Sequence, residues 1–112
     1  MLKITLLTEG EELSLRVEGH AEYAEPGKDI VCASASILAQ IVAYDVDLLD
    51  RFNAYKEPAV IRLERGSAEI TCIPTDASRH IRDTYLFAGK GFDLLAQNYP
   101  QYVEFITDVK YD

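Results

Sequence analysis

The chain has few of the residues that build metal centres and disulfide frameworks. Its 112 residues include only two cysteines, Cys32 and Cys72, and two histidines, His20 and His80. Two cysteines do not make the set of bridges that staples small secreted domains, so we expect free thiols in a reducing cytoplasm. A zinc site needs three or four ligands, and no short-spaced pair is present, so we predict no metal and no cofactor.

Basic residues are scarce as well, and they form no cluster. The chain carries 19 acidic and 11 basic residues, for a formal net charge of −8. The lack of a basic stripe argues against direct nucleic-acid binding. No run approaches the roughly 18 apolar residues of a membrane span, so we expect no membrane association. An acidic surface keeps a small protein soluble, and it also steers a basic partner toward it.

The pattern of apolar residues predicts a two-layer α+β domain. Alternation of apolar and polar residues predicts strands over residues 3–6, 13–17, 60–64, 68–73 and 102–106. Two long segments, from residue 30 to about 52 and roughly over 77–98, predict helices. The order ββαββαβ indicates two helices packed on a mostly antiparallel sheet. The length predicts one domain over residues 1–112, and 48% hydrophobic residues supply its core.

Local signals refine this outline. Leu13, Leu15 and Val17 should line one buried face of the second strand. Asp76 is a plausible N-cap for the second helix. Cys72 falls on the apolar face of its strand and is expected in the core, whereas His80 is expected at the surface.

One stretch of the chain can carry nucleophilic chemistry. His20 lies in a glycine-punctuated loop, and Cys32 follows it by twelve positions, where the long apolar helix begins. If Asp29 caps that helix, Cys32 lies in its first turn. Free N–H groups and the helix dipole there favour a thiolate, and they can hold an oxyanion. His20 would then be the general base or the imidazolium partner of that thiolate.

Each of these residues also has a structural interpretation. Cys32 can be a small buried hydrophobe, as free cysteines often are. Asp29 can orient a histidine or simply cap the helix. Ser36 lies one turn after Cys32 on the same helix face and can donate a hydrogen bond to the site, or bond the preceding turn instead.

The motifs around these residues resemble the bacterial ribosomal-processing cysteine protease (Prp) family. The resemblance rests on Gly-His-Ala-x-Tyr-Ala over residues 19–24 and Gly-x-Asp-Ile-Val-Cys-Ala-x-x-Ser over residues 27–36. It extends to Gly-Phe-x-x-Leu-Ala-x-x-Tyr-Pro-x-Tyr-Val over residues 91–103, so it covers nearly the whole chain. The chain departs from it at Ser34 and Ala35, where the family commonly has Ala-Val.

The resemblance implies a function and a set of site residues. Family members cut the N-terminal extension from a large-subunit ribosomal protein, which implies a cysteine endopeptidase acting on a basic precursor. His20 and Cys32 would be its catalytic dyad, with Asp29 and Ser36 in supporting roles. Gly19 and Gly27 would bound a mobile loop that carries the histidine. The family also implies a homodimer.

Other functions fit the same residues. The acidic segment after residue 44 and the run over residues 34–40 look closer to prophage-type relatives, which would cleave a phage structural protein. A non-catalytic binding module for ribosome or phage assembly would need neither reactive residue. A redox sensor would need Cys72 as a resolving partner for Cys32, and the strand position of Cys72 argues against it.

Overall fold

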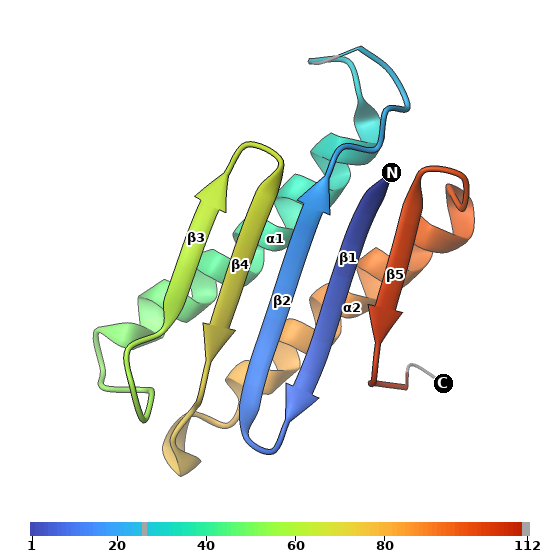
Figure 1. Ribbon diagram of the computed structural model, residues 1–112. Coiled ribbons are helices and arrows are strands. Elements are labelled where there is room, and N and C mark those ends of the chain that lie inside the picture. Colours follow the sequence, from blue (N-terminus) through green and yellow to red (C-terminus); the bar gives the residue numbers. More distant parts are fainter. Residues whose placement is uncertain (26, 111–112) are drawn as a thin grey trace.

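Two β-hairpins and a final strand form one sheet, and both helices cover the same face of it. The computed structural model describes residues 1–25 and 27–110 (Figure 1). The elements are β1 (Leu2–Glu9), β2 (Glu12–Gly19), α1 (Ile30–Asp50), β3 (Val60–Glu64), β4 (Ser67–Cys72), α2 (Ile81–Asn98) and β5 (Val103–Thr107). This order and the two-layer arrangement confirm the α+β fold predicted from the sequence.

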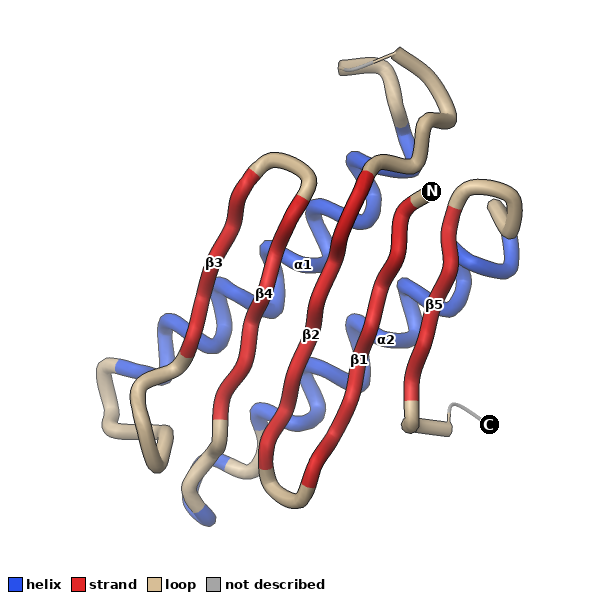
Figure 2. Tube along the Cα trace, viewed as in Figure 1, coloured by secondary structure: helices blue, strands red, loops and turns tan. Residues whose placement is uncertain are grey.

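The sheet has five strands in the order β3-β4-β2-β1-β5 (Figure 2). The β1–β2, β2–β4 and β3–β4 pairs are antiparallel, whereas β1 and β5 run parallel. The sheet is therefore mostly antiparallel, as predicted. Its register sets Leu2 opposite Gly19 on one side and Val103 on the other, so the end of β2 lies beside the start of the chain.

The core fills the space between the sheet and the helices. Its largest fully buried side chains are Ile4, Leu6, Leu13, Leu15, Val31, Val42, Val46, Ile70, Ile81, Tyr85 and Phe92. The predicted buried row of β2 is confirmed, and Cys72 is buried as expected. The other face of the sheet is polar, and Arg16 pairs there with Glu69 across β2 and β4 at 3.1 Å. The helix-covered face of the sheet is therefore the one that builds the core.

Helix α1 is the more apolar of the two helices. Its mean hydropathy reaches 1.5, so by length and composition alone it could cross a membrane. In this structure it lies on the sheet, and the side chains that it buries there are Val31, Ala35, Ala39, Val42, Ala43 and Val46. Only one side of this apolar helix serves the core, because Ile37, Ile41 and Tyr44 on its other side are exposed.

The helices approach each other closely where the second one carries glycine. A Cβ atom added at Gly91 of α2 would lie 2.8 Å from a terminal methyl group of Leu38 on α1. Glycine at this position therefore leaves room for the Leu38 side chain.

The ends of the helices differ from the sequence prediction. The second helix begins at Ile81 rather than near residue 77, and Asp76 lies in a short 3₁₀ turn, Asp76–Ser78, so it is not the N-cap. The buried Ser78 explains the difference, because its N–H bonds to the Thr75 carbonyl at 2.9 Å and tightens the chain before the helix starts. His80 occupies the N-cap position without a side-chain capping bond.

Substitution of Phe92 tests the description of the core between the sheet and α2. Its side chain is fully buried, whereas Phe87 on the same helix is 68% exposed. We expect Phe92→Ala to lower the free energy of unfolding by about 3–5 kcal/mol, because it leaves a cavity. The matched change Phe87→Ala should alter it by no more than about 0.5 kcal/mol. Urea denaturation followed by circular dichroism measures both, and equal losses would contradict this description of the core.

Candidate active site

The start of α1 is organised by one carboxylate. Oδ1 of Asp29 accepts hydrogen bonds from the N–H groups of Val31 at 3.0 Å and Cys32 at 2.9 Å. Oδ2 accepts from the N–H groups of Tyr23 at 3.0 Å and Ala24 at 3.4 Å, in the preceding loop. Asp29 is thus the N-cap of the helix and also ties the loop to it. The contacts of Asp29 match the capping interpretation rather than that of a histidine-orienting residue.

These contacts determine the charge state of Asp29. Its burial raises the pKa, but the four backbone N–H groups stabilise the carboxylate more, and the pKa ends below the ordinary 3.8. The carboxylate is therefore ionised at neutral pH, which is the state that accepts all four bonds.

Cys32 lies in the first turn of α1, half-buried, with its sulfur at a cleft. The backbone N–H of Ala21 donates a hydrogen bond to Cys32 Sγ at 3.2 Å. Since the sulfur faces a cleft, Cys32 differs from the buried hydrophobe that a free cysteine usually is.

Three backbone N–H groups at this helix start are already bonded. The N–H groups of Val31 and Cys32 are taken by the Asp29 side chain, and that of Ala33 bonds to the Asp29 carbonyl at 3.0 Å. A side-chain cap thus occupies amides that a bare helix start would leave free, so these three donors are not available for the oxyanion site suggested by the sequence.

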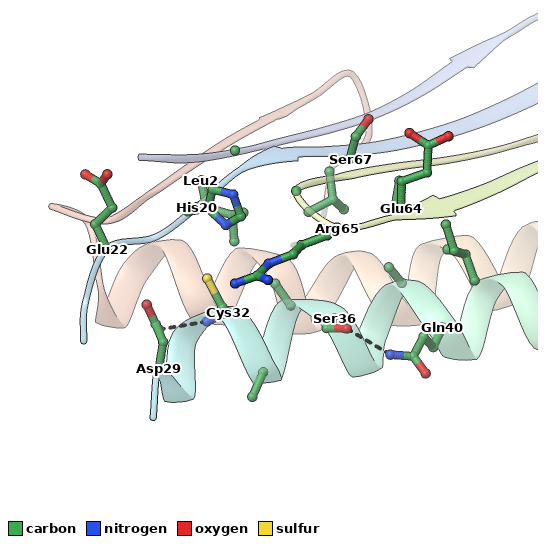
Figure 3. Close-up of a pocket in the computed structure, with 18 of the residues that line it drawn as sticks. Leu2, His20, Glu22, Asp29, Cys32, Ser36, Gln40, Glu64, Arg65 and Ser67 are labelled. Atoms are coloured by element: carbon green, nitrogen blue, oxygen red, sulfur yellow. Dashed lines mark hydrogen bonds between the residues drawn. The ribbon is translucent and has the colours of Figure 1, made fainter. Parts of the chain in front are cut away.

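His20 reaches the same cleft from the end of β2. The N–H of Gly19 bonds to the Gly66 carbonyl in the β3–β4 turn at 2.9 Å. A Cβ atom added at Gly66 would lie 2.9 Å from Nε2 of His20, so the imidazole rests on this turn. Figure 3 shows the His20 ring and the Cys32 sulfur facing the same space, and no hydrogen bond joins them among the described residues.

The cleft has a volume of about 870 Å³ and three walls. The first is the loop between β2 and α1, the second is the exposed side of the first turns of α1, and the third is the β3–β4 turn. The side chains of α1 that line it are Cys32, Ala33, Ala35, Ser36, Ala39 and Gln40. Small residues along α1 leave room for an extended peptide beside the sulfur.

Ser36 lines the cleft one turn after Cys32, as predicted. Its Oγ accepts a hydrogen bond from Nε2 of Gln40 at 2.8 Å, so the hydroxyl hydrogen can be donated elsewhere. Among the described residues it makes no hydrogen bond to Cys32. The bond to the preceding helical turn is made instead by Ser34, whose Oγ donates to the Ile30 carbonyl at 2.7 Å.

The two predicted loop glycines both have left-handed backbones, with φ of +88° at Gly19 and +86° at Gly27. A Cβ atom at Gly19 would lie only 2.6 Å from the Met1 carbonyl oxygen, so no other residue fits there without a shift. The loop between them is also held by Tyr23, whose ring makes edge-to-face contacts with Tyr99 and Tyr102. These contacts position the segment that follows His20.

The other candidate residues are placed away from the cleft. Cys72 is buried, and this burial raises the pKa of its thiol even though the Tyr85 hydroxyl contacts its sulfur. His80 is exposed at the start of α2. Among residues 1–25 and 27–110, no group of three or more His, Cys, Asp or Glu side chains could hold a metal ion.

Comparison with known proteins identifies the family. The family model described as "Cysteine protease Prp" matches residues 1–104. The chain belongs to the cysteine protease Prp family. This confirms the resemblance found in the motifs around His20 and Cys32. No sequence match was found among curated proteins.

Solved structures share the Prp fold. Staphylococcus aureus Prp in complex with a covalently linked product peptide has 21% identity and a TM-score of 0.66, over 96% of this chain and 100% of that chain. The same protease in complex with a substrate peptide has 18% identity and a TM-score of 0.54, over 96% and 100%. SMU.848 from Streptococcus mutans has 23% identity and a TM-score of 0.58, over 96% and 93%.

In this member of the Prp family, one cleft collects all the site residues predicted from the sequence, namely Gly19, His20, Gly27, Asp29, Cys32 and Ser36. Sequence reasoning missed the third wall, where Arg65 of the β3–β4 turn enters the same space (Figure 3). A turn residue in a hairpin distant along the chain gives no local signal of a site. Only the sheet order, which sets β4 next to β2, brings it there.

Asp29 gives a pH-dependent test of this arrangement. At pH 7 we expect Asp29→Ala to lower the free energy of unfolding by about 1–2 kcal/mol, the cost of losing an N-cap. Because the pKa of Asp29 is lowered by folding, its stabilisation is present above an unfolded-state pKa of about 3.9 and is lost as the pH falls through the lower folded value. The difference in free energy of unfolding between wild type and variant should therefore shrink as the pH falls below about 3.9. Urea denaturation at stepped pH measures it, and a constant gap would refute the carboxylate's role.

Proposed function

We propose that this chain is a sequence-specific cysteine endopeptidase that removes the N-terminal extension of a large-subunit ribosomal protein. The observation that carries the proposal is the placement of Cys32 Sγ, which accepts an N–H hydrogen bond and faces the cleft that His20 also lines. Membership of the Prp family supports cysteine protease chemistry at this cleft. The peptide complexes of S. aureus Prp support a peptide as the ligand.

The proposed reaction uses Cys32 as nucleophile and His20 as acid and base. The thiolate attacks the scissile carbonyl carbon, and His20 protonates the leaving amine. Water activated by His20 then hydrolyses the thioester. The His20 ring and Cys32 sulfur are not hydrogen bonded here, and substrate binding tightens such contacts in many enzymes. Asp29 supports the reaction by fixing Cys32, and the Ser36 hydroxyl is available to the substrate.

Charge supports a basic substrate. The net charge of −8 attracts a basic precursor such as a ribosomal protein, and it disfavours direct contact with nucleic acid. Cys32 and Cys72 are both free thiols, which suits a cytoplasmic enzyme.

A cleavage assay tests the proposal. The purified protein is incubated with the extended ribosomal precursor of its host, and intact mass spectrometry reads the products. We expect one N-terminal cut, no detectable cut with Cys32→Ala, and a rate about 10²–10⁴-fold lower with His20→Ala. Cys72→Ala is the matched control, since it removes the buried thiol and should leave cleavage unchanged once folding is verified by circular dichroism.

Alkylation of the thiols separates the protease from a binding module. A nucleophilic Cys32 should react with iodoacetamide at pH 6 in a His20-dependent way, while the buried Cys72 stays protected. No cut combined with an unreactive Cys32 would overturn the protease and favour a binding module. No cut with a reactive Cys32 would overturn the ribosomal substrate and direct the search to phage structural proteins.

We also propose that the protein is a homodimer joined through the outer face of α1. That face carries a row of exposed apolar side chains, Ile37, Ile41, Tyr44 and Leu48, at helical spacing. We call these four residues the α1 outer row. A contiguous apolar row of this kind is typical of an interaction surface.

Ile41→Glu tests the dimer, because a charge in the α1 outer row would have to be buried without a partner. We expect light scattering coupled to size exclusion to give a dimer mass for the wild type and a monomer mass for Ile41→Glu. The same change at Ile106, which is 40% exposed on β5, should leave the dimer intact. The proposal would be contradicted if the wild type were a monomer in solution, or if Ile41→Glu and Ile106→Glu had the same oligomeric state.

A further inference from the structure

The cleft contains a cation whose role the proposed dyad does not explain. Arg65 lies at the β3–β4 turn and lines the cleft together with His20 and Cys32. Figure 3 shows its guanidinium group extended from the turn toward α1, on the side of the cleft between Cys32 and Ser36. Any catalytic role of Arg65 rests on the proposed peptidase function.

The β3–β4 turn, which carries Arg65, is hydrogen bonded to the end of β2, next to His20. Gly66 follows Arg65 with φ of +79°, and its carbonyl accepts the Gly19 N–H at 2.9 Å. The missing side chain of Gly66 also makes room for the His20 ring. Arg65 and His20 are therefore positioned by the same contact, although they lie far apart in the sequence.

No acidic group of the described chain neutralises Arg65. Its guanidinium makes no hydrogen bond or ion pair among residues 1–25 and 27–110. Three acidic residues line the cleft, Glu22, Asp29 and Glu64. Asp29 is engaged by four backbone N–H groups, and Glu64 lies 3.6 Å from Arg62 instead. Glu22 lies at the far side of the cleft in Figure 3. The Arg65 guanidinium is thus available to a ligand.

The chemistry of acyl transfer needs such a donor at this place. Attack by a thiolate puts negative charge on the carbonyl oxygen, and hydrogen-bond donors aimed at that oxygen lower the barrier. The N–H groups of Val31, Cys32 and Ala33 are occupied by Asp29. The Ala21 N–H is directed at Cys32 Sγ. Arginine offers five N–H donors in a planar fork and keeps its charge at any working pH.

We propose that Arg65 is a further catalytic residue, which binds the carbonyl oxygen of the scissile bond as charge develops on it. The electron pair of Cys32 Sγ forms the C–S bond while the carbonyl π pair moves to oxygen. Arg65 donates an N–H hydrogen bond to that oxygen and keeps its proton. When the carbonyl re-forms, the C–N bond breaks and the amine takes its proton from His20.

The first test is the kinetics of cleavage of a precursor peptide that spans the cut site. Arg65→Gln should lower kcat by about 10²–10³-fold with KM nearly unchanged, the usual loss for one oxyanion donor. Arg65→Lys should recover part of kcat, because it restores the charge without the planar fork. The matched control is Arg62→Gln, which removes the same charge from the same hairpin outside the cleft. It should cleave like the wild type.

The second test does not depend on turnover. A peptide aldehyde that ends at the cut site forms a hemithioacetal with Cys32, and its oxygen occupies the place of the developing oxyanion. We expect Arg65→Gln to weaken binding of the aldehyde by a similar factor, and to leave binding of the matching peptide alcohol unchanged. Competition with iodoacetamide alkylation of Cys32 gives both affinities.

The outcomes distinguish this proposal from the proposed function. If the wild type cleaves and binds the aldehyde while Arg65→Gln does so equally well, Arg65 has no catalytic role and the peptidase stands. Arg65→Gln could instead raise KM alone and weaken binding of the peptide alcohol as much as binding of the peptide aldehyde. Arg65 would then bind another part of the substrate, and its oxyanion role would be overturned. If the wild type neither cleaves nor binds the aldehyde, both proposals fall.

Discussion

The geometry of this active-site cleft depends on the Asp29 carboxylate. One group accepts hydrogen bonds from two amides of the first turn of α1 and two amides of the loop before it. The bonds to α1 determine where the helix begins, and therefore where the side chain of Cys32 emerges. The bonds to the loop hold the chain on the other side of the sulfur, where Ala21 donates to it. Burial of a carboxylate is costly, and here the backbone donors offset that cost.

Because Asp29 caps the helix with its side chain, the amides that it occupies are not free to bind another anion. The amides that stabilise Asp29 are the ones that a helix start would otherwise present to an anion. The cap thus orders the start of α1, where Cys32 lies. For the proposed thiol chemistry, the β3–β4 turn is the neighbouring element that can supply further hydrogen-bond donors. The candidate site is assembled from three segments, and the sheet order β3-β4-β2 sets the β3–β4 turn beside the end of β2.

Much of the fold could be predicted from the sequence, because its signals are local. Alternation in β2 and the uninterrupted apolar segment from Ile30 onward each reflect burial on one face, and the structure confirms both. The start of α2 could not be placed in the same way. Asp76 is a good capping residue, but the 3₁₀ turn is set by Ser78 being buried, which is a tertiary effect.

The candidate site likewise combines features that local sequence signals predict with features that only tertiary contacts determine. His20, Asp29 and Cys32 lie within one short segment, so their spacing relative to a helix start is enough to suggest a nucleophile from the sequence alone. The amides of Val31 and Cys32 are occupied through a local N-cap, which the sequence already suggested at Asp29. The position of Arg65, in contrast, follows from contacts between distant segments, such as that of Gly19 with Gly66. No periodicity or motif encodes such contacts. The glycine at position 66 is recognisable in the sequence as a turn signal, but its role under the His20 ring is not.

The parallel pairing of β1 with β5 links the cleft to the order of synthesis. Leu2 lines the cleft and pairs with Val103, so the strand that begins the chain is completed by the strand near its end. Contacts between such distant segments require loop closure before they form, and this slows folding. During translation, β1 keeps one edge unpaired until the residues of β5 have left the ribosome. The floor of the cleft therefore depends on a pairing between segments that lie far apart in the sequence, so it cannot form before the residues of β5 have been made.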